Sequence, residues 1–447
     1  MDTKQTILIR GGQIIDPSQH INFVGNLLIE NGLIKELDFP DTDLPGAEII
    51  DANGLVISPG FIDLHCHLRE PGFEYKETIA TGTKAAAHGG FTTVCAMPNT
   101  NPVMDSRAIV EFVLDKAKNE GCIRVLPIGA ITKNSDGLEL SEMSELADAG
   151  CIGFSDDGRP LEDAHIMRQA LIYASALKLP IINHCEVPEL ALDGVMHEGW
   201  VSNRLGLIGI PNSTEDSMVA RDISLAEETG GRIHIAHAST AGTVDLIAGA
   251  KERGVNISCE VTPHHLTLND SAVLGKGQTL DPLLPSSYDT NAKVAPPLRS
   301  SRDVKSMVDG LRDSVVDFIA TDHAPHSSSE KECSFEEAVK GISVLETALA
   351  SLLSLVHKGL IDLPTLIDRL TIGPANFLGM DLGTLKPGST ADITIFDPEL
   401  EWMVDSSKFV SKGKNTPLDG NILKGKVVAT IFSGNFVYKS EGISNDR

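Results

Sequence analysis

Short apolar runs that close on histidine or aspartate recur along this chain, and this repetition constrains the fold more than any other feature. The runs are rich in Val, Ile, Phe and Ala, and helix-like stretches at 80–88, 109–119, 163–176, 215–229 and 243–253 lie between most of them. Strands that alternate with helices predict a parallel sheet, and eight such units predict a (β/α)8 barrel. The eight runs are 57–67, 92–97, 124–130, 151–155, 180–184, 232–237, 255–261 and 316–321.

The residues that end these runs are of one chemical kind. His65 and His67 lie two apart in a strand, so both side chains point to the same side, while Cys66 points the opposite way into packing. Later runs end at His184, at His237, at Asp322 and at the adjacent pair Asp156 and Asp157. Barrel enzymes keep their chemistry at the carboxyl ends of the strands. Four His and two Asp gathered there are suitable ligands for two zinc-like ions.

An open, doubly wound sheet is the alternative fold. It explains the alternation of strands and helices, but it leaves the repeated ligands at the strand ends as coincidence. Spacing alone does not decide whether Asp156 or Asp157 belongs to the site. Each Asp or His taken singly also has an ordinary role, because an aspartate in such a position often caps a turn or helix.

The two ends of the chain differ from its middle. Short strands and turns alternate near the start, as at 7–12 and 26–32, and again near the end, as at 391–397 and 427–434. We therefore expect residues 1–56 and 381–447 to build one small β-sandwich from both termini, and residues 57–380 to form the barrel.

Composition excludes several classes of function. Acidic residues outnumber basic ones by 62 to 37, which gives a net charge of −25 and argues against a nucleic-acid partner. The first residues lack the apolar core of a signal peptide, and no apolar run reaches membrane-spanning length. The seven cysteines are scattered without a CxxC pair, so we expect them to be reduced. These features favour a soluble, cytoplasmic protein with no membrane partner.

Several motifs resemble one enzyme family over nearly the whole chain. Residues 59–72 (PGFIDLHCHLREPG), 97–100 (MPNT) and 320–326 (ATDHAPH) are similar to signatures of the bacterial class I dihydroorotases, members of the cyclic amidohydrolase superfamily, and the similarity continues through 376–379 (NFLG) and 386–392 (KPGSTAD). The resemblance implies a zinc-dependent hydrolase of cyclic amide C–N bonds. It would interconvert N-carbamoyl-L-aspartate and dihydroorotate in pyrimidine biosynthesis, as a homodimer able to associate with aspartate transcarbamoylase.

The resemblance also implies roles for individual residues. Two zinc ions would be held by six ligands. Residues 150–158 contain no lysine that could be carbamylated, so the resemblance implies an aspartate as the bridge, and alignment with the family makes it Asp157 rather than Asp156. Asp322 would also act as general acid and base. The metal ligands implied are His65, His67, Asp157, His184, His237 and Asp322, and the substrate contacts implied are His67, Arg69, Asn99 and His326.

Two positions depart from the family pattern. Ala295 stands where dihydroorotases often carry an asparagine that binds substrate, and Lys340 stands where many carry phenylalanine. Two alternative functions stay open. One is a hydantoinase or allantoinase on the same scaffold, against which the pair Arg69 and Asn99 argues as a carboxylate clamp. The other is an inactive scaffold subunit of aspartate transcarbamoylase, against which the complete set of metal ligands argues. We assign packing and hydrogen bonding to His264 and His265.

Overall fold

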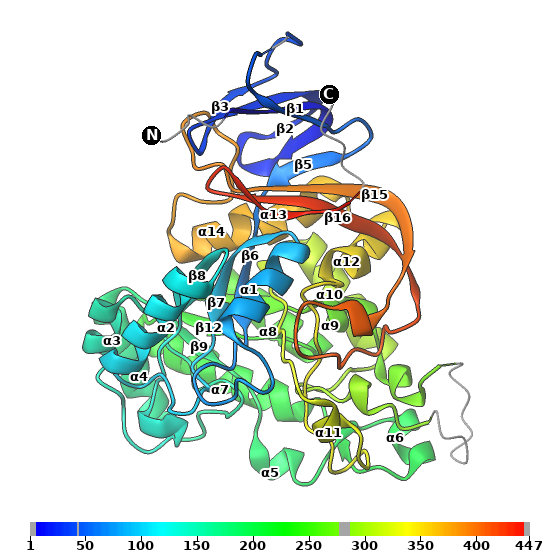
Figure 1. Ribbon diagram of the computed structural model, residues 1–447. Coiled ribbons are helices and arrows are strands. Elements are labelled where there is room, and N and C mark those ends of the chain that lie inside the picture. Colours follow the sequence, from blue (N-terminus) through cyan, green and yellow to red (C-terminus); the bar gives the residue numbers. More distant parts are fainter. Residues whose placement is uncertain (1–5, 43, 277–286, 442–447) are drawn as a thin grey trace.

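The computed structural model describes residues 6–42, 44–276 and 287–441, and a closed parallel barrel lies at its centre (Figure 1). Strands β6, β7 and β8 form one parallel sheet, and β9, β12, β13 and β14 form another. Phe154 pairs with both neighbouring strands to join the sheets, and Cys66 pairs with His323 to close the ring. The predicted (β/α)8 barrel is confirmed, with seven regular strands and with Phe154, in the predicted run 151–155, at the place of the eighth. The strands are β6 (Phe61–Cys66), β7 (Phe91–Ala96), β8 (Arg124–Pro127), β9 (Ile181–Asn183), β12 (Ile233–Ile235), β13 (Ile257–Val261) and β14 (Phe318–Ile319).

Helices surround the barrel, and their sequences contain the expected caps. The side chain of Thr78 accepts a hydrogen bond from the third residue of α1, and Thr240 does the same for α8. The main helices are α1 (Ile79–His88), α2 (Arg107–Glu120), α3 (Met143–Ala149), α4 (Ala164–Leu177), α7 (Ser213–Thr229), α8 (Ala241–Glu252), α10 (Ser301–Arg312), α12 (Ala348–His357) and α13 (Leu363–Leu370). Shorter elements are α5 (Pro188–Ala191), α6 (Trp200–Leu205), α9 (Pro263–Thr267), α11 (Ser328–Lys331), α14 (Ile372–Leu378), β10 (Met196–His197) and β11 (Gly209–Ile210).

Strands from both termini share one sheet with a hydrophobic core of its own. The hydrogen-bonded order is β17-β16-β15-β5-β1-β2-β3, and β4 pairs with β1. Its core brings together isoleucines of β1 and β2 with those of β15 and β16. The predicted joining of the two ends is confirmed. The strands are β1 (Thr6–Asp16), β2 (Ile21–Glu30), β3 (Leu33–Leu37), β4 (Glu48–Asp51), β5 (Val56–Pro59), β15 (Ile393–Met403), β16 (Ile422–Phe432) and β17 (Asn435–Lys439).

The run 57–67 is two strands rather than the single strand we predicted. Its first part is β5, which pairs with β1 and β15 of the terminal sheet, and its second part is β6 of the barrel. The chain changes sheets at Gly60, where a Cβ atom would lie 2.2 Å from the hydroxyl oxygen of Thr92. Only glycine fits so close an approach. The strands on both sides of Gly60 are apolar, so the hydrophobic pattern does not indicate the change of sheets.

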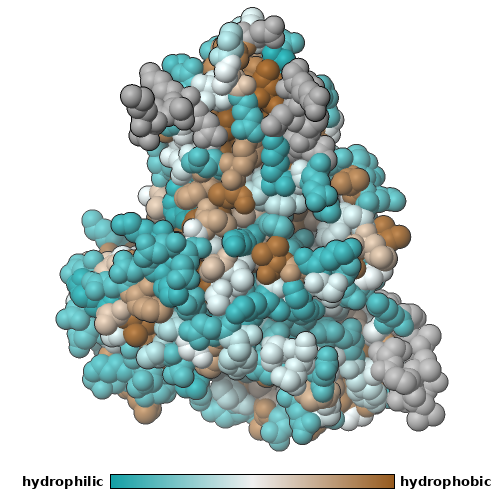
Figure 2. Space-filling model, viewed as in Figure 1, coloured by the Kyte–Doolittle hydropathy of each residue, from teal (hydrophilic) through white to brown (hydrophobic). Residues whose placement is uncertain are grey.

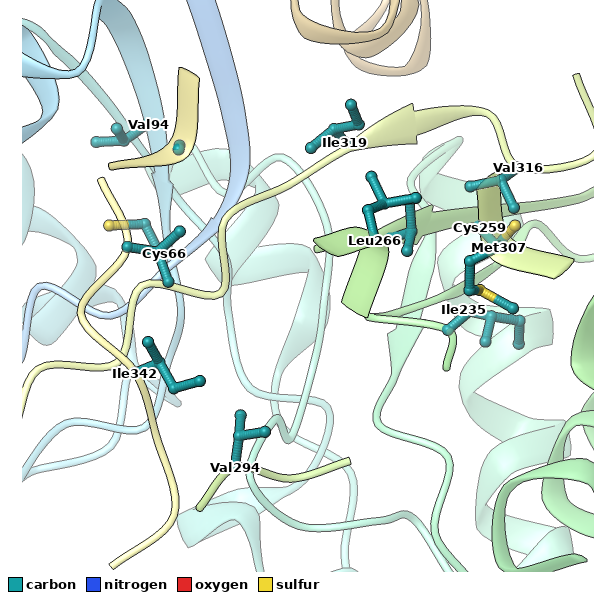
Figure 3. Packing of buried hydrophobic residues seen from close by; sticks show 14 of the residues in the cluster. Cys66, Val94, Ile235, Cys259, Leu266, Val294, Met307, Val316, Ile319 and Ile342 are labelled. Atoms are coloured by element: carbon teal, nitrogen blue, oxygen red, sulfur yellow. The ribbon is translucent and has the colours of Figure 1, made fainter. Parts of the chain in front are cut away.

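Buried apolar side chains fill the space between the barrel and its helices. Figure 3 shows part of this core, with Cys66, Val94, Ile235 and Cys259 among the labelled side chains. Cys66 is fully buried there, as its place between the two histidines predicted. Figure 2 shows that hydrophilic side chains cover most of one face, with apolar patches scattered among them. Within the described residues, no helix is both long and apolar enough to cross a membrane.

Candidate metal centre and substrate cleft

Six buried side chains meet at the carboxyl ends of the barrel strands. His65 lies in β6 and His67 directly follows it, while His184 and His237 come one and two residues after β9 and β12. Asp157 follows the pairing residue Phe154, and Asp322 follows β14. Each of the six is at most 5% exposed. The parallel barrel brings these residues together from five separate segments of sequence, as the pattern of strand ends predicted.

One group of ligand atoms gathers around Asp322. Its Oδ1 lies 3.0 Å from Nε2 of His67 and 3.6 Å from Nε2 of His65. Ligand atoms of these three residues all fall within 4.8 Å of one another, which suits one metal ion. Nε2 of His65 is buried and has no hydrogen-bond partner among the described residues. A buried nitrogen aimed at two carboxylates without a hydrogen bond fits a metal ligand.

A second group lies across Asp157. Nδ1 of His184 and Nε2 of His237 are 2.9 Å apart, and Asp157 Oδ1 lies 3.8 Å and 3.4 Å from them respectively. The other oxygen of Asp157 lies 3.4 Å from Nε2 of His67 in the first group. Asp157 therefore faces both groups. A carboxylate in this position can bridge two ions about 3.5–4 Å apart.

Asp156 has a different environment. Its Oδ1 accepts hydrogen bonds from the backbone of Ile131 and Thr132, at 2.9 Å and 3.1 Å, and its Oδ2 accepts one from the Thr132 hydroxyl at 2.5 Å. These three bonds occupy the carboxylate away from the histidine cluster. The structure thus separates the two aspartates that spacing alone left equivalent, and it places Asp157 with the histidines.

Glu260 and Asn99 orient the rings of His65 and His67 through hydrogen bonds to Nδ1. Nδ1 of His65 donates to Oε1 of Glu260 at 2.7 Å, and the other oxygen of Glu260 lies 3.2 Å from Nε2 of His234. Nδ1 of His67 donates to Oδ1 of Asn99 at 2.9 Å. These bonds orient both rings so that Nε2 of His65 faces Asp157 and Nε2 of His67 faces Asp322, as expected of metal ligands. Asn99 was predicted as a substrate contact, and it lines the cleft.

Sequence reasoning missed Glu260 and Asp63. Glu260 interrupts the apolar run of β13, and a fully buried glutamate in a barrel strand is the signal that was available. Asp63 lies in β6, and its carboxylate accepts bonds from the backbone and hydroxyl of Thr321, at 2.7 Å and 2.5 Å. Burial raises the pKa of Asp63 to about 7, although these bonds lower it. Asp63 thereby ties β6 to the residue before Asp322.

Burial and close neighbours together set the protonation states of the clustered side chains. Burial penalises the carboxylate of Asp322, but the hydrogen bond to His67 and the neighbouring imidazoles hold its pKa well below its usual range. Burial, together with His237, lowers the pKa of His184 to about 4. At neutral pH the site therefore presents an ionised Asp322 and a neutral His184, which are protonation states that bind metals. Burial lowers the pKa of His65 and of His237, but nearby carboxylates outweigh it and raise both values, so these rings would release protons as a metal binds.

The backbone is strained at three of these positions. Arg69, His237 and Asp322 have φ angles of 63°, 34° and 46°, which non-glycine residues rarely adopt. Such conformations cost of order 1–3 kcal/mol each and persist where the surrounding structure fixes them. Of the thirteen non-glycine residues with a positive φ angle among the described residues, these three lie together at the rim that carries the clustered His and Asp side chains.

A cleft opens over these side chains and contains the predicted substrate contacts. Arg69 donates from Nε to the carbonyl of Pro325 at 3.3 Å, and its Nη2 lies 3.4 Å from Nε2 of His326. His326 donates from Nε2 to the carbonyl of Lys340 at 2.9 Å, and burial lowers its pKa strongly, so its ring is neutral. Ala295 and Lys340, the two departures from the family pattern, also line this cleft.

The neighbouring histidines only partly follow the prediction of hydrogen bonding. His265 bonds to the Thr262 hydroxyl at 2.8 Å and to the carbonyl of Pro296 at 3.0 Å. His264 is equally buried, but neither ring nitrogen has a partner among the described residues. The imidazole ring of His264 packs beside that of His265, with the ring centroids 4.6 Å apart.

Comparisons with known proteins agree with this geometry. Residues 54–243 match a family described as Dihydro-orotase-like. A dihydroorotase of Geobacter metallireducens is 50% identical over 97% of this chain and 99% of its own length, and one of Pelotomaculum thermopropionicum is 49% identical over 98% and 99%. Among solved structures, a dihydropyrimidinase of Brevibacillus agri has a TM-score of 0.84 at 23% identity, covering 98% of this chain and 96% of its own. An L-hydantoinase of Arthrobacter aurescens has a TM-score of 0.83 at 23% identity, with coverages of 99% and 98%. These two structures share the fold.

Proposed function

Because this chain belongs to the dihydroorotase family, we propose that it catalyses the reversible cyclisation of N-carbamoyl-L-aspartate to (S)-dihydroorotate and water. The observation that carries the proposal is the position of Arg69, Asn99 and His326 in the same cleft as five of the six clustered His and Asp side chains, all but His65. Such a cleft combines side chains suited to metal-assisted hydrolysis with side chains that can bind a carboxylate. The reaction belongs to pyrimidine biosynthesis.

We propose two zinc ions as the resident metals. Three ligands would hold the first ion and two the second, with Asp157 shared between them. The unpaired Nε2 of His65 and the close approach of His184 to His237 support this assignment. When bound, such ions polarise a carbonyl and lower the pKa of water to near neutrality. The first ion would be held by His65, His67 and Asp322, and the second by His184 and His237.

Asp322 is proposed as the group that moves the proton. In the hydrolytic direction it would take a proton from the attacking water and deliver it to the departing amide nitrogen of the ring. Its carboxylate is ionised at rest because of the neighbouring imidazoles, so it can accept that proton. Its contact with His67 and the strained backbone at position 322 keep it directed into the cleft.

Arg69, Asn99 and His326 are proposed to bind the carboxylate that dihydroorotate carries and that hydantoin and allantoin lack. An arginine fork meets a carboxylate through two parallel hydrogen bonds. The Arg69 side chain is held in place by the Pro325 carbonyl, which reduces the entropy lost on binding. This feature favours dihydroorotate over the neutral cyclic amides of the related hydantoinases.

The proposal is tested by assaying dihydroorotate, hydantoin and allantoin side by side, with metal analysis of the same sample. Turnover of dihydroorotate at a kcat/KM far above that of the other two is expected. Preference for hydantoin or allantoin would contradict the substrate assignment. Metal-free, inactive protein that still binds aspartate transcarbamoylase would favour the scaffold alternative.

The remaining proposals concern organisation. A hydrophobic core in the terminal sheet supports a division into a terminal sandwich, residues 1–56 with 381–447, and a barrel, residues 57–380. Ile57 packs in the terminal core and β5 pairs within the terminal sheet, which favours Gly60 over residue 57 as the first boundary. A homodimer, an association with aspartate transcarbamoylase and a cytoplasmic location follow from the family alone. Analytical ultracentrifugation of the protein, alone and with aspartate transcarbamoylase, tests the first two.

A further inference from the structure

A segment of the C-terminal part of the chain reaches the substrate cleft. Residues 409–416 lie between β15 and β16, the two long strands of the terminal sheet, yet they pack against the barrel loop that follows β14. The contact is close: a Cβ atom at Gly413 would lie 2.4 Å from the Cβ of Pro325. Nothing in the sequence pattern places this segment at the functional end of the barrel.

The side chain of Asn415 makes the main connection. Its Nδ2 donates to the carbonyls of Ala324 and Gly341, both at 3.0 Å. Its Oδ1 accepts from the backbone N–H of His326 at 3.0 Å and from the hydroxyl of Ser343 at 2.8 Å. Asn415 is only 3% exposed, so these four bonds are made away from water, where losing one is costly.

The partners of Asn415 belong to two walls of the cleft. Ala324 and His326 lie on the loop that begins at Asp322, and Gly341 lies on a separate segment next to Lys340. The two walls touch directly, because a Cβ atom at Gly341 would lie 2.8 Å from Nε2 of His326. The amide of Asn415 thus fixes the spacing between the proposed carboxylate contact and the opposite wall.

A second set of bonds anchors the same segment. The hydroxyl of Ser411 donates to Oε2 of Glu77 at 2.5 Å, and Glu77 also lies 3.5 Å from Nε2 of His323. The backbone N–H of Ser411 donates to Glu346 at 3.1 Å. Nδ1 of His323 accepts from the backbone of Val344 at 3.0 Å. These bonds hold residues 409–416 in place against the barrel, so the segment can position the cleft residues that bond to it.

We propose that Asn415 is a positioning residue for substrate recognition, acting through His326 and Gly341. The metal ligands are fixed by strand ends and by Glu260 and Asp63, so Asn415 governs the fit of the substrate more than the chemical step. An aspartate at this position keeps the acceptor but loses both donors, and it places a negative charge against two carbonyl oxygens. The inference depends on the proposed function only for the choice of assay substrate.

The test compares Asn415→Asp with wild type for zinc content, thermal unfolding, KM and kcat with dihydroorotate. We expect KM to rise about tenfold while kcat changes less than threefold and zinc content is unchanged. The matched control is Asn421→Asp, which makes the same change in charge at an exposed position nearby and should leave KM unaltered. An unchanged KM in folded Asn415→Asp, or equal losses of kcat, zinc and thermal stability, would overturn the proposal.

A milder variant covers the case in which Asn415→Asp does not fold. Ser343→Ala removes one bond to Asn415 and should raise KM about two- to fivefold with zinc retained, whereas an unchanged KM would count against the positioning role. If the wild-type protein acts on another cyclic amide instead, the proposed function is wrong but the positioning role of Asn415 is still testable. The same comparison of KM is then made with that substrate.

Discussion

Replacement of Glu260 by glutamine is expected to weaken metal binding without unfolding the barrel. Glu260 is fully buried and accepts from Nδ1 of His65 at 2.7 Å while facing Nε2 of His234 at 3.2 Å. Glutamine has the same shape and can still accept from His65, and its amide group can face His234, whose other nitrogen lies 2.9 Å from the Ser258 hydroxyl. What the variant removes is the negative charge.

The size of the effect follows from that single change. Hydrogen bonds to charged groups contribute about 1.5–3 kcal/mol, against about 0.5–1.5 kcal/mol for neutral ones, so the loss is about 1–2 kcal/mol. This corresponds to roughly a 5- to 30-fold weaker metal affinity, which overlaps the range of about 10–100-fold known for groups that orient metal ligands. Glu260→Ala leaves His65 Nδ1 without a partner and should weaken binding further.

The measurement is zinc affinity by competition with a chromophoric chelator, with activity followed in parallel. The matched control is Glu252→Gln, the same substitution at an exposed position near the end of α8, which should change neither quantity. If Glu260→Gln binds zinc as tightly as wild type at both sites, Glu260 does not support the metal centre, and the account of how His65 is oriented is wrong.

Three other changes have distinct expected outcomes. Asp157→Ala should abolish binding of two ions, whereas Asp156→Ala should cost stability with zinc retained; equal zinc loss in both, by metal analysis, would contradict the assignment of the bridge. Arg69→Met should raise KM for dihydroorotate at least about 30-fold at constant zinc content, because roughly 2–5 kcal/mol of charge-assisted binding is removed, and an unchanged KM would reject the clamp. Burial raises the pKa of Glu346 from 4.5 to about 7, so the folded state holds this proton more tightly than the unfolded chain and stability falls as pH rises from about 4.5 through 7. Glu346→Gln should therefore gain about 2–3 kcal/mol relative to wild type between pH 5 and pH 8 in urea unfolding, and a gain that does not depend on pH would refute this.

The sequence allowed the barrel and the clustering of His and Asp side chains at its strand ends to be predicted because both depend on local pattern. Apolar runs separated by helices specify parallel strands, and the alternation of side chains in a strand places His65 and His67 on one side. Spacing alone did not decide between Asp156 and Asp157, since adjacent residues in an irregular segment have no fixed direction. The family resemblance implied Asp157, and the structure places this side chain beside the histidines. The break at Gly60 was hidden because both strands that meet there are hydrophobic.

Other features of the site could not be predicted because they depend on long-range packing. Glu260 interrupts an apolar run, but its partner His65 is identified only when the closed barrel brings β13 within reach of β6. Asn415 lies 93 residues beyond Asp322 and in a part of the chain predicted to build only the terminal sandwich, so its contact with the cleft follows from the tertiary fold. The departures at Ala295 and Lys340 do lie on the cleft wall, where they can alter affinity for substrate.

Titration of the metal-free protein with zinc, with activity measured at each addition, tests the central claim most directly. The proposed centre predicts that activity on dihydroorotate is absent without metal, rises with added zinc and reaches its plateau at about two equivalents per chain. In His184→Ala the protein should retain about one equivalent and little activity. Full wild-type activity with one ion or with none would contradict the binuclear centre.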